Sequence, residues 1–260
     1  MKLRVLGCSG SDLPGHHLTS FLVNGHILLD AGSVTSSLSL EEQVRITDIF
    51  VTHPHLDHIK DILFLADNLI EFVAQHNHPP VNLRAMPEVL DAISTHLLND
   101  TIWPDFTVIP ANSPVLSYAP MPAGTPVEVG GLTVTACPVN HAKHASGFII
   151  HGPGEDEAFA YTGDTGPSDG WWACLAALDR PVKNIVTEAS FPNHLEELAR
   201  ISKHLTPKML RAELAKLPYK PKVFIYHMKA PFSEQIQEEL HLAMDGYSYH
   251  LMREEDSFEF

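Results

Sequence analysis

One short segment constrains this chain more than any other, the run Thr52-His53-Pro54-His55-Leu56-Asp57-His58-Ile59. It places three histidines and an aspartate within six residues, directly after an apolar, β-branched run that predicts a strand over 46–51. Apolar residues at helical spacing follow over 59–73, so the four polar side chains lie where a strand gives way to a helix. In the extended part, alternate side chains such as His53 and His55 project to the same side.

These residue types are the ligands of a metal site. Imidazole nitrogen suits zinc, iron and manganese, and Asp57 adds a hard anionic oxygen. The alternative is a surface loop that is rich in histidine by chance, because the chain has 17 histidines among 260 residues. Three of them beside an aspartate at one strand end favour the metal site, and such a loop can supply ligands to two adjacent ions.

Composition predicts one globular domain over residues 1–260. The sequence is 44% hydrophobic and contains no long Gly/Ser linker and no internal repeat. Its net charge of −15 disfavours binding along a nucleic acid, because that normally requires stripes of Lys and Arg. A small anionic substrate remains compatible, since bound metal ions supply positive charge locally.

The cysteines and the start of the sequence indicate a cytoplasmic protein. Cys8, Cys137 and Cys174 are widely spaced and odd in number, so we expect buried free thiols rather than a disulfide framework. The apolar stretch at 3–6 is too short for a signal peptide, and no apolar run reaches the length of a membrane span.

Strands recur before helices along the chain, with polar residues at the strand ends. This pattern predicts a layered αββα or α/β protein, although it does not predict the sheet topology. We expect strands at 3–6, 21–23, 27–29, 46–51, 81–85, 132–136, 147–150, 158–162, 185–187 and 223–226, and helices at 40–44, 59–73, 87–99, 171–177, 195–202 and 207–217. The Pro-rich stretch at 110–126 is expected to be an irregular surface segment.

Three later strands repeat the opening pattern, in which an apolar strand ends at a ligand-type residue. The strand at 132–136 leads to His141, the one at 158–162 leads to Asp164, and the one at 223–226 leads to His227. Each residue alone is an ordinary turn former. Together with the first cluster, they predict one metal centre.

With these residues the sequence resembles the metallo-β-lactamase superfamily of binuclear metallohydrolases, over nearly the whole chain. The resemblance implies a four-layer αββα sandwich, and a hydroxide held between two metals as the nucleophile. One metal would be held by His53, His55 and His141, and the other by Asp57, His58 and His227, with Asp164 bridging them. Asp57 would also hold the hydroxide.

Three segments are similar to the class II cyclic-nucleotide phosphodiesterases within that superfamily. They are the 52–59 loop, the run His96-Leu97-Leu98-Asn99-Asp100-Thr101-Ile102-Trp103-Pro104-Asp105-Phe106, and the run Tyr161-Thr162-Gly163-Asp164-Thr165-Gly166-Pro167. The sequence departs from that branch at Lys60 and Asp61, where a small residue is usual. That departure places a charged pair beside the expected site.

Glu188 and His204 are expected to serve catalysis. Glu188-Ala189-Ser190-Phe191 followed by His204-Leu205-Thr206 is similar to a motif of the phosphodiesterase branch, in which the carboxylate orients the histidine. A carboxylate fixes the imidazole tautomer and raises its pKa, which favours a proton donor at neutral pH. The alternative is that Glu188 only ends a strand and His204 only caps a helix.

Two aromatic residues and one further histidine are weaker candidates. Trp103 and Phe106 have the faces to stack on a base, although core packing is the commoner fate of aromatic residues. His144, three residues after His141, is a candidate outer partner of that ligand.

The function that these observations favour is hydrolysis of a 3′,5′-cyclic nucleotide by a binuclear metal-dependent phosphodiesterase. Zinc is the metal we expect, with iron and manganese as alternatives. The substrate would be a small phosphodiester. We expect neither a membrane nor a long nucleic acid as partner, and the sequence is compatible with a homodimer. Three alternatives remain: a tRNA 3′-processing endonuclease, a lactonase-type hydrolase, and a metal-binding sensor with little turnover.

Overall fold

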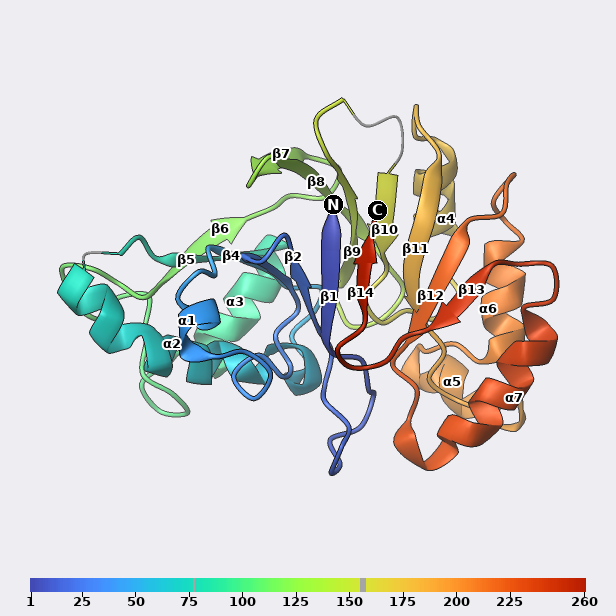
Figure 1. Cartoon of the computed structure of the whole chain (residues 1–260), viewed down its shortest axis with the longest axis horizontal. Helices are drawn as coiled ribbons and strands as arrows, with labels where there is room; N and C mark the ends of the chain where they lie inside the picture. The colour runs from blue at the N-terminus through green and yellow to red at the C-terminus, as the bar shows by residue number, and fades with distance from the viewer. Residues whose placement is uncertain (77, 155–157) are drawn as a thin grey trace.

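Two β-sheets stacked face to face form the centre of the molecule (Figure 1). The computed structural model describes residues 1–76, 78–154 and 158–260. Within these ranges each sheet has seven strands, in the orders β14-β1-β2-β3-β4-β5-β6 and β13-β12-β11-β10-β9-β8-β7. Each sheet therefore consists mainly of one half of the chain, and the C-terminal β14 crosses over to pair with β1.

The first sheet and its helices come mainly from the N-terminal half. Its strands are β1 (Lys2–Gly7), β2 (Ser20–Val23), β3 (Ile27–Leu29), β4 (Asp48–Phe50), β5 (Val81–Ala85), β6 (Leu116–Pro120) and β14 (Ser257–Glu259). The helices are α1 (Leu40–Gln43), α2 (Leu56–His76) and α3 (Pro87–His96). Their apolar faces pack with the outer face of this sheet in one hydrophobic core.

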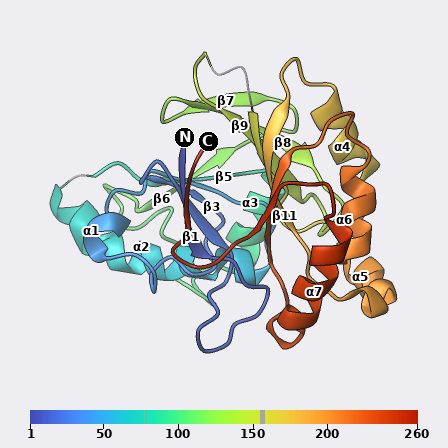
Figure 2. The ribbon, with the colours of Figure 1, turned by 45° about the vertical axis from the view of Figure 1, so that its right-hand side comes forward.

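The second sheet and its helices come from the C-terminal half. Its strands are β7 (Pro126–Val129), β8 (Leu132–Pro138), β9 (Ser146–His151), β10 (Ala158–Tyr161), β11 (Val182–Glu188), β12 (Lys222–Tyr226) and β13 (Tyr249–Leu251). The helices are α4 (Asp169–Ala176), α5 (Glu196–Ser202), α6 (Pro207–Leu214) and α7 (Ser233–Ala243), with short 3₁₀ turns η1 (Asn193–Leu195) and η2 (Ala230–Phe232). Figure 2 shows these helices along the outer side of the sheet.

A third hydrophobic core fills the space between the sheets. Alternate side chains of β1 and β8 illustrate it: Leu3 and Val5 from one sheet, and Val134 and Ala136 from the other, all enter this layer. Helices, sheet, sheet and helices therefore follow one another as four layers. The expected αββα sandwich is confirmed.

All of the expected elements are present, most with shifted ends, and the structure adds β6, β7, α7, β13 and β14, which were not expected. The Asn24-Gly25 hairpin turn has both residues at positive φ, 50° and 79°, as its sequence requires. The 110–126 stretch is less irregular than expected, because it contains β6 and leads directly into β7. Both are edge strands, where proline is tolerated, and the pairing of β6 with β5 is what orders that segment.

Parallel strands bring several loops to one edge of the molecule. In the second sheet β10, β11 and β12 pair in parallel, so residues that follow their C-terminal ends emerge side by side. In the first sheet β4 runs parallel to β3 and β5, and its C-terminal end leads into the histidine-rich loop. The ends of these strands build the site.

The cysteines lie as free thiols, as expected, although two of them are neighbours. Cys137 on β8 is buried and Cys174 on α4 is half-buried, with their sulfur atoms 2.6 Å apart. Wide spacing in the sequence gave no sign of this proximity. Among the described residues, none of the helices has the combination of length and apolar character that crossing a bilayer demands.

Candidate metal centre

The loop between β4 and α2 places its four polar side chains around one point. His53 and His58 are fully buried, His55 is exposed, and Asp57 is half-buried. The helix begins at Leu56, earlier than its apolar spacing indicates, and the His58 backbone N–H donates to the His55 carbonyl oxygen at 2.9 Å. This first turn folds the chain back, so that Asp57 and His58 face the same region as His53.

Asp164 lies at the centre of the cluster. Its Oδ2 atom is 3.9 Å from Nε2 of His53, 3.3 Å from Nε2 of His58 and 3.9 Å from Nε2 of His141. Its Oδ1 atom is 3.0 Å from Nδ1 of His227. One buried carboxylate therefore faces four imidazole rings that are delivered by three separate segments of the chain.

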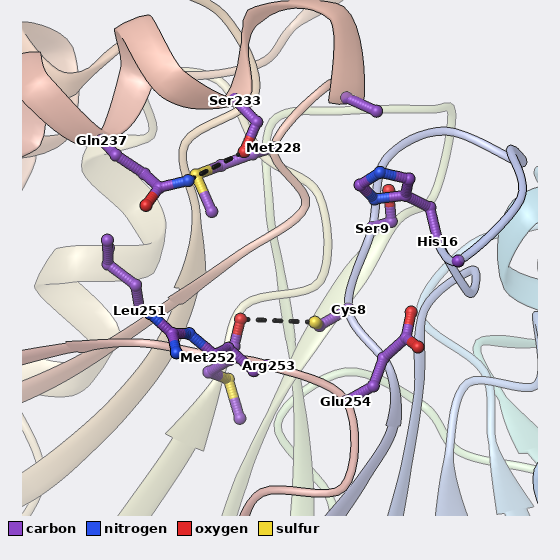
Figure 3. Close-up of a pocket in the computed structure, with 12 residues that line it drawn as sticks. Cys8, Ser9, His16, Met228, Ser233, Gln237, Leu251, Met252, Arg253 and Glu254 are labelled. Atoms are coloured by element: carbon purple, nitrogen blue, oxygen red, sulfur yellow. Dashed lines mark hydrogen bonds between the residues drawn. The ribbon is translucent and has the colours of Figure 1, made fainter.

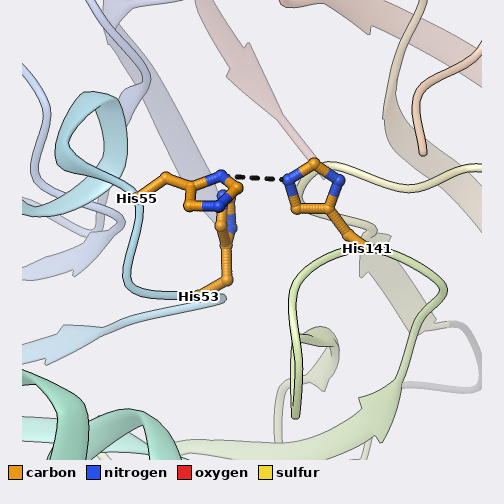
Figure 4. Close-up of side chains that lie close together, drawn as sticks. All are labelled: His53, His55 and His141. Atoms are coloured by element: carbon orange, nitrogen blue, oxygen red, sulfur yellow. Dashed lines mark hydrogen bonds between the residues drawn. The ribbon is translucent and has the colours of Figure 1, made fainter. Parts of the chain in front are cut away.

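The seven residues expected as ligands all converge, and they divide into two overlapping groups. His53, His55 and His141 form one group, shown in Figure 4, where Nδ1 of His55 and Nε2 of His141 are 3.1 Å apart. Asp57, His58, Asp164 and His227 form the other group. In each group the potential ligand atoms lie within 4.8 Å of one another.

The donor atoms of this cluster fit divalent cations. Nε2 of His53, His58 and His227 is buried in each case and has no hydrogen-bond partner among the described residues. Leaving a buried polar atom without a hydrogen-bond partner costs free energy. Three such atoms around one carboxylate therefore indicate that a bound ligand, and not another protein atom, is their partner. Imidazole and carboxylate together are suited to zinc, iron or manganese.

Most of the imidazoles are held in the neutral form that binds metal. Burial lowers the pKa of His53 well below its usual range, and it lowers the pKa of His227 to about 4. Burial also lowers the pKa values of His55 and His141. His58 differs: burial opposes its charge, but the carboxylates of Asp164 and Asp30 outweigh burial and raise its pKa. A cation bound at Nε2 would compete with that proton.

Asp30 belongs to the site, although its sequence context indicates only the end of a strand. It is fully buried directly after β3, at a φ of +56°. Its Oδ2 atom accepts from Nδ1 of His58 at 2.7 Å and from the Thr52 hydroxyl at 2.8 Å. Because the hydroxyl proton of Thr52 goes to Asp30, its oxygen accepts from Nδ1 of His53 at 2.9 Å. Asp30 therefore sets the tautomers of two expected ligands.

His141 receives its outer contact from the segment after α5. Its Nδ1 donates to the Lys203 carbonyl oxygen at 2.8 Å, which leaves Nε2 for the cluster. The candidate outer partner His144 does not fill this role, because its ring lies 3.5 Å from the Glu88 carboxylate on α3. His144 stands in a left-handed turn at a φ of +63°.

Glycines allow the loops to approach this closely. Gly163, directly before Asp164, has a φ of +61°, and a Cβ atom there would lie 2.8 Å from the Thr52 side chain. A Cβ atom at Gly32 would lie 2.1 Å from the carbonyl oxygen of Asp57. A larger residue at Gly163 would displace Thr52, which supports His53, and a larger residue at Gly32 would displace the expected ligand Asp57.

Glu188 and His204 form the expected pair at the edge of the cluster. Nδ1 of His204 donates to Oε1 of Glu188 at 2.7 Å. The same carboxylate accepts from the backbone N–H groups of Thr165 and Leu205, and from the Ser190 hydroxyl. Burial disfavours charge on His204, but the Glu188 charge and hydrogen bond outweigh burial and raise the histidine pKa. The pair therefore favours the protonated imidazole.

The His204 ring is close enough to act together with the cluster. Its Nδ1 atom is 4.0 Å from Oδ2 of Asp164, and the ring centroid is 4.8 Å from that of His141. Together with His141 and Asp164, it forms a third group of potential ligand atoms. Glu188 occupies its Nδ1, so Nε2 is the ring nitrogen that this carboxylate leaves free.

The charges of Lys60 and Asp61 are paired with each other beside the cluster. Asp61 is buried and accepts from the backbone N–H and the hydroxyl of Thr35, at 2.7 and 3.0 Å. The Lys60 ammonium lies 3.4 Å from the same carboxylate. The pair therefore fixes the first turns of α2 against the 31–35 segment.

The two aromatic candidates have different surroundings. Phe106 is 1% exposed and belongs to the core under the first sheet, so its ring offers no open face to a base. This corrects the expectation of a substrate contact at Phe106. Trp103 is half-buried, and its ring makes an edge contact with Phe64 of α2 at 5.2 Å between centroids. Substrate stacking on Trp103 stays a prediction.

A separate hollow of about 350 Å³ is lined by residues of the loop after β1, of the segment after β12 and of α7 (Figure 3). Ser9 and His16 border it on one side, and Ser233 and Gln237 of α7 border it on another. None of the seven expected ligands, all of them described, lines it. The Cys8 thiol donates to the Met252 carbonyl oxygen, and burial raises its pKa to about 12, so this thiol is no nucleophile.

Fold and site together define the class of protein. A buried set of histidines and aspartates at the strand ends of an αββα sandwich is the arrangement of a metal-dependent hydrolase. Residues 26–228 match the sequence model of the family described as the beta-lactamase superfamily domain. The chain therefore belongs to that family.

Relatives and solved structures agree with this assignment. A protein of Yersinia pestis named as a probable 3′,5′-cyclic-nucleotide phosphodiesterase is 26% identical, over 97% of this chain and 79% of that protein. A 3′,5′-cyclic-nucleotide phosphodiesterase of Aliivibrio fischeri is 27% identical, over 82% of this chain and 74% of that protein. The crystal structure of unliganded yeast PDE1 has the same fold, with a TM-score of 0.80 at 18% identity and 98% coverage of both chains.

Proposed function

We propose that this chain is a binuclear metal-dependent phosphodiesterase whose substrate is a 3′,5′-cyclic nucleotide. The observation that carries the proposal is the Glu188–His204 pair beside the two ligand groups. A lactonase has no anionic phosphate to stabilise, whereas hydrolysis of a phosphodiester calls for both charge stabilisation and help to the leaving oxygen. Two relatives that carry this activity in their names support the choice of substrate.

In this proposal the seven converging residues hold the metals. His53, His55 and His141 would hold one cation, Asp57, His58 and His227 would hold the other, and Asp164 would contact both. Two divalent cations, when bound, lower the pKa of a water molecule and neutralise charge on the phosphate. We expect zinc, with iron or manganese as alternatives. Asp57, which is partly open to solvent, would also accept a hydrogen bond from the attacking water.

His204 would act on the substrate rather than on the metals. Hydrolysis adds water across one P–O ester bond of the cyclic phosphate, and the departing ribose oxygen must take up a proton. The His204 imidazolium, oriented by Glu188, is the group placed to donate that proton or to neutralise a phosphate oxygen. Ser190 and the backbone N–H groups on Glu188 keep the carboxylate ionised and in place.

We also propose that residues 1–260 act as one domain. The core between the sheets is shared, and Leu3 of the first sheet belongs to the same buried layer as Phe224 of the second. The site itself takes residues from both halves, His53 and His58 from one and His227 from the other. Neither half holds a complete ligand set.

A substrate panel on protein of defined metal content tests the proposal. Metal-free protein would be reloaded with zinc, iron or manganese and offered cyclic AMP, cyclic GMP, bis(p-nitrophenyl) phosphate, precursor tRNA and a lactone, with Asp164→Ala as the matched control. We expect metal-dependent hydrolysis of a cyclic nucleotide, and its loss in the variant. Processing of precursor tRNA, lactone hydrolysis alone, or tight metal binding without turnover would each overturn the proposal in favour of a different function.

A further inference from the structure

Two buried tyrosines end the strands that deliver two of the expected ligands. Tyr161 is the last residue of β10, three residues before Asp164, and Tyr226 is the last residue of β12, directly before His227. Both are fully buried in the core between the sheets. The rings contact Phe21 edge-on in the same way, with centroid distances of 5.4 and 5.3 Å and interplanar angles of 78° and 82°.

The two hydroxyl groups differ in what they contact. The Tyr161 hydroxyl donates to Oδ2 of Asp30 at 2.6 Å. Among the residues that the structure describes, the Tyr226 hydroxyl donates only to the Tyr161 oxygen, at the long distance of 3.5 Å. Two residues with nearly the same packing are therefore distinguished by one hydrogen bond to a buried carboxylate.

That carboxylate depends on its donors. Asp30 has no solvent exposure, and burying a carboxylate without hydrogen bonds is costly. Its Oδ2 atom accepts from Nδ1 of His58, from the Thr52 hydroxyl and from the Tyr161 hydroxyl. Burial, and then the charge of Asp30, raise the pKa of Tyr161 well above its usual value, so the phenol keeps the proton that it donates.

We infer that Tyr161 is a positioning residue for the metal centre. Its hydroxyl fixes the Asp30 carboxylate, and Asp30 in turn holds the His58 ring with Nδ1 protonated and Nε2 turned to the cluster. Through the Thr52 hydroxyl, the same carboxylate holds His53. A tyrosine on the second sheet thus orients two histidines that belong to the first. The inference rests on the proposed function only in taking His53 and His58 as metal ligands.

The pair Tyr161→Phe and Tyr226→Phe tests this, because each substitution removes one buried hydroxyl and keeps the ring. Zinc affinity would be measured by competition with a chromophoric chelator, and the melting temperature of each metal-free protein would be measured separately. Outer partners of metal ligands typically change metal affinity by about 10–100-fold, and Tyr161 acts one hydrogen bond further out. We therefore expect about 3–10-fold weaker zinc binding in Tyr161→Phe and less than about 2-fold change in Tyr226→Phe.

A second measurement reports on the ring itself. In ¹⁵N NMR spectra of the metal-free wild type, we expect the His58 signals of a ring that carries a proton on Nδ1, and in Tyr161→Phe we expect these signals to move while those of Tyr226→Phe do not. A purely structural role for Tyr161 would lower the melting temperature and leave zinc affinity and the His58 signals unchanged. Equal loss of affinity in both variants would also overturn the inference.

Failure of the inference is distinguishable from failure of the proposed function. If wild-type protein binds no zinc, the metal centre itself is wrong. If wild-type protein binds zinc and Tyr161→Phe binds it equally well, the centre stands and only the positioning role of Tyr161 is wrong.

Discussion

At the scale of single residues, the partner of one ring nitrogen decides what the other nitrogen can do. Thr52 holds His53, Asp30 holds His58, and in each case Nε2 is turned toward the cluster without a hydrogen-bond partner among the described residues. In His204, by contrast, the partner of one ring nitrogen changes the charge of the ring. Its partner Glu188 raises the pKa of the ring, which favours the protonated form.

Replacing His204 with Ala should leave the metals in place and slow the chemistry. The ring lies outside the seven-ligand set, so we expect unchanged metal content and a kcat for the cyclic nucleotide that is lower by about 10²–10⁴-fold. The loss should be smaller for a nitrophenyl phosphodiester, because its acidic leaving group needs less help from a proton. Steady-state kinetics on both substrates, with elemental analysis of the variant, measure this.

The outcome of that comparison separates two roles for His204. Equal losses on the activated and the natural substrate would assign the ring to phosphate binding. Full activity on both substrates would contradict any part in catalysis and leave His204 as a buried residue near the end of α5.

At the scale of elements, the turns after the strands hold the ligands at their distances. Gly163→Ala should lower both stability and metal affinity, because its φ of +61° disfavours a side chain and the new Cβ would lie 2.8 Å from Thr52. We expect a loss of about 1–3 kcal/mol in the free energy of unfolding of the metal-free protein. Chemical denaturation and zinc competition measure the two effects.

Gly124→Ala is the matched control for that variant. Gly124 has a φ of +72°, and a Cβ atom added there would meet nothing within 4 Å, so it shares the backbone penalty and lacks the contact. It should lose stability by a smaller amount and keep its metal affinity. If both variants lose affinity equally, the contact between Gly163 and Thr52 has no role in the centre.

A comparison of the helices and strands with the sequence shows which parts of the structure a local pattern predicts. The expected ligands follow strands with clear apolar character, and parallel pairing brings together the strand ends before Asp164 and His227, whereas β8, which leads to His141, pairs antiparallel. The strands β13 and β14 are only three residues long, and they form through pairing with distant partners, which a local pattern does not contain. The role of Asp30 is hidden for the same reason, since its four donor groups belong to three residues that lie far from it in the sequence.

At the scale of the whole molecule, pH links the centre to folding. Burial lowers the folded-state pKa values of four expected ligands, His53, His55, His141 and His227, the last to about 4. The unfolded chain takes up protons on these rings near pH 6.5, whereas the folded chain does not. Their contribution to stability is therefore present above about pH 6.5 and is lost as the pH falls toward the folded-state values.

His58 and His204 act in the opposite direction. The pKa of each is raised in the fold, so the stability that they contribute is present at acidic pH and is lost as the pH rises through their raised values. With four lowered groups against two raised ones, the metal-free protein should lose stability on mild acidification. The metal-loaded protein should lose more, because the bound cations require neutral rings.

Thermal melts between about pH 7.5 and pH 5, with zinc and with chelator, measure this difference. We expect the melting temperature of the zinc-loaded protein to fall more steeply and to meet that of the chelated protein at the acidic end. Parallel curves for the two samples would show that metal release is not the cause of the acid sensitivity.

The most direct measurement is the metal content of the purified, reloaded protein. Elemental analysis should find two divalent ions per chain in the wild type. Fewer are expected in His55→Ala, which removes one ligand of the first group, and in Asp164→Ala, which removes the carboxylate that faces both groups. Circular dichroism confirms that each variant is folded. Two ions per chain in the wild type and in both folded variants would contradict the proposed centre, and with it the phosphodiesterase built on it.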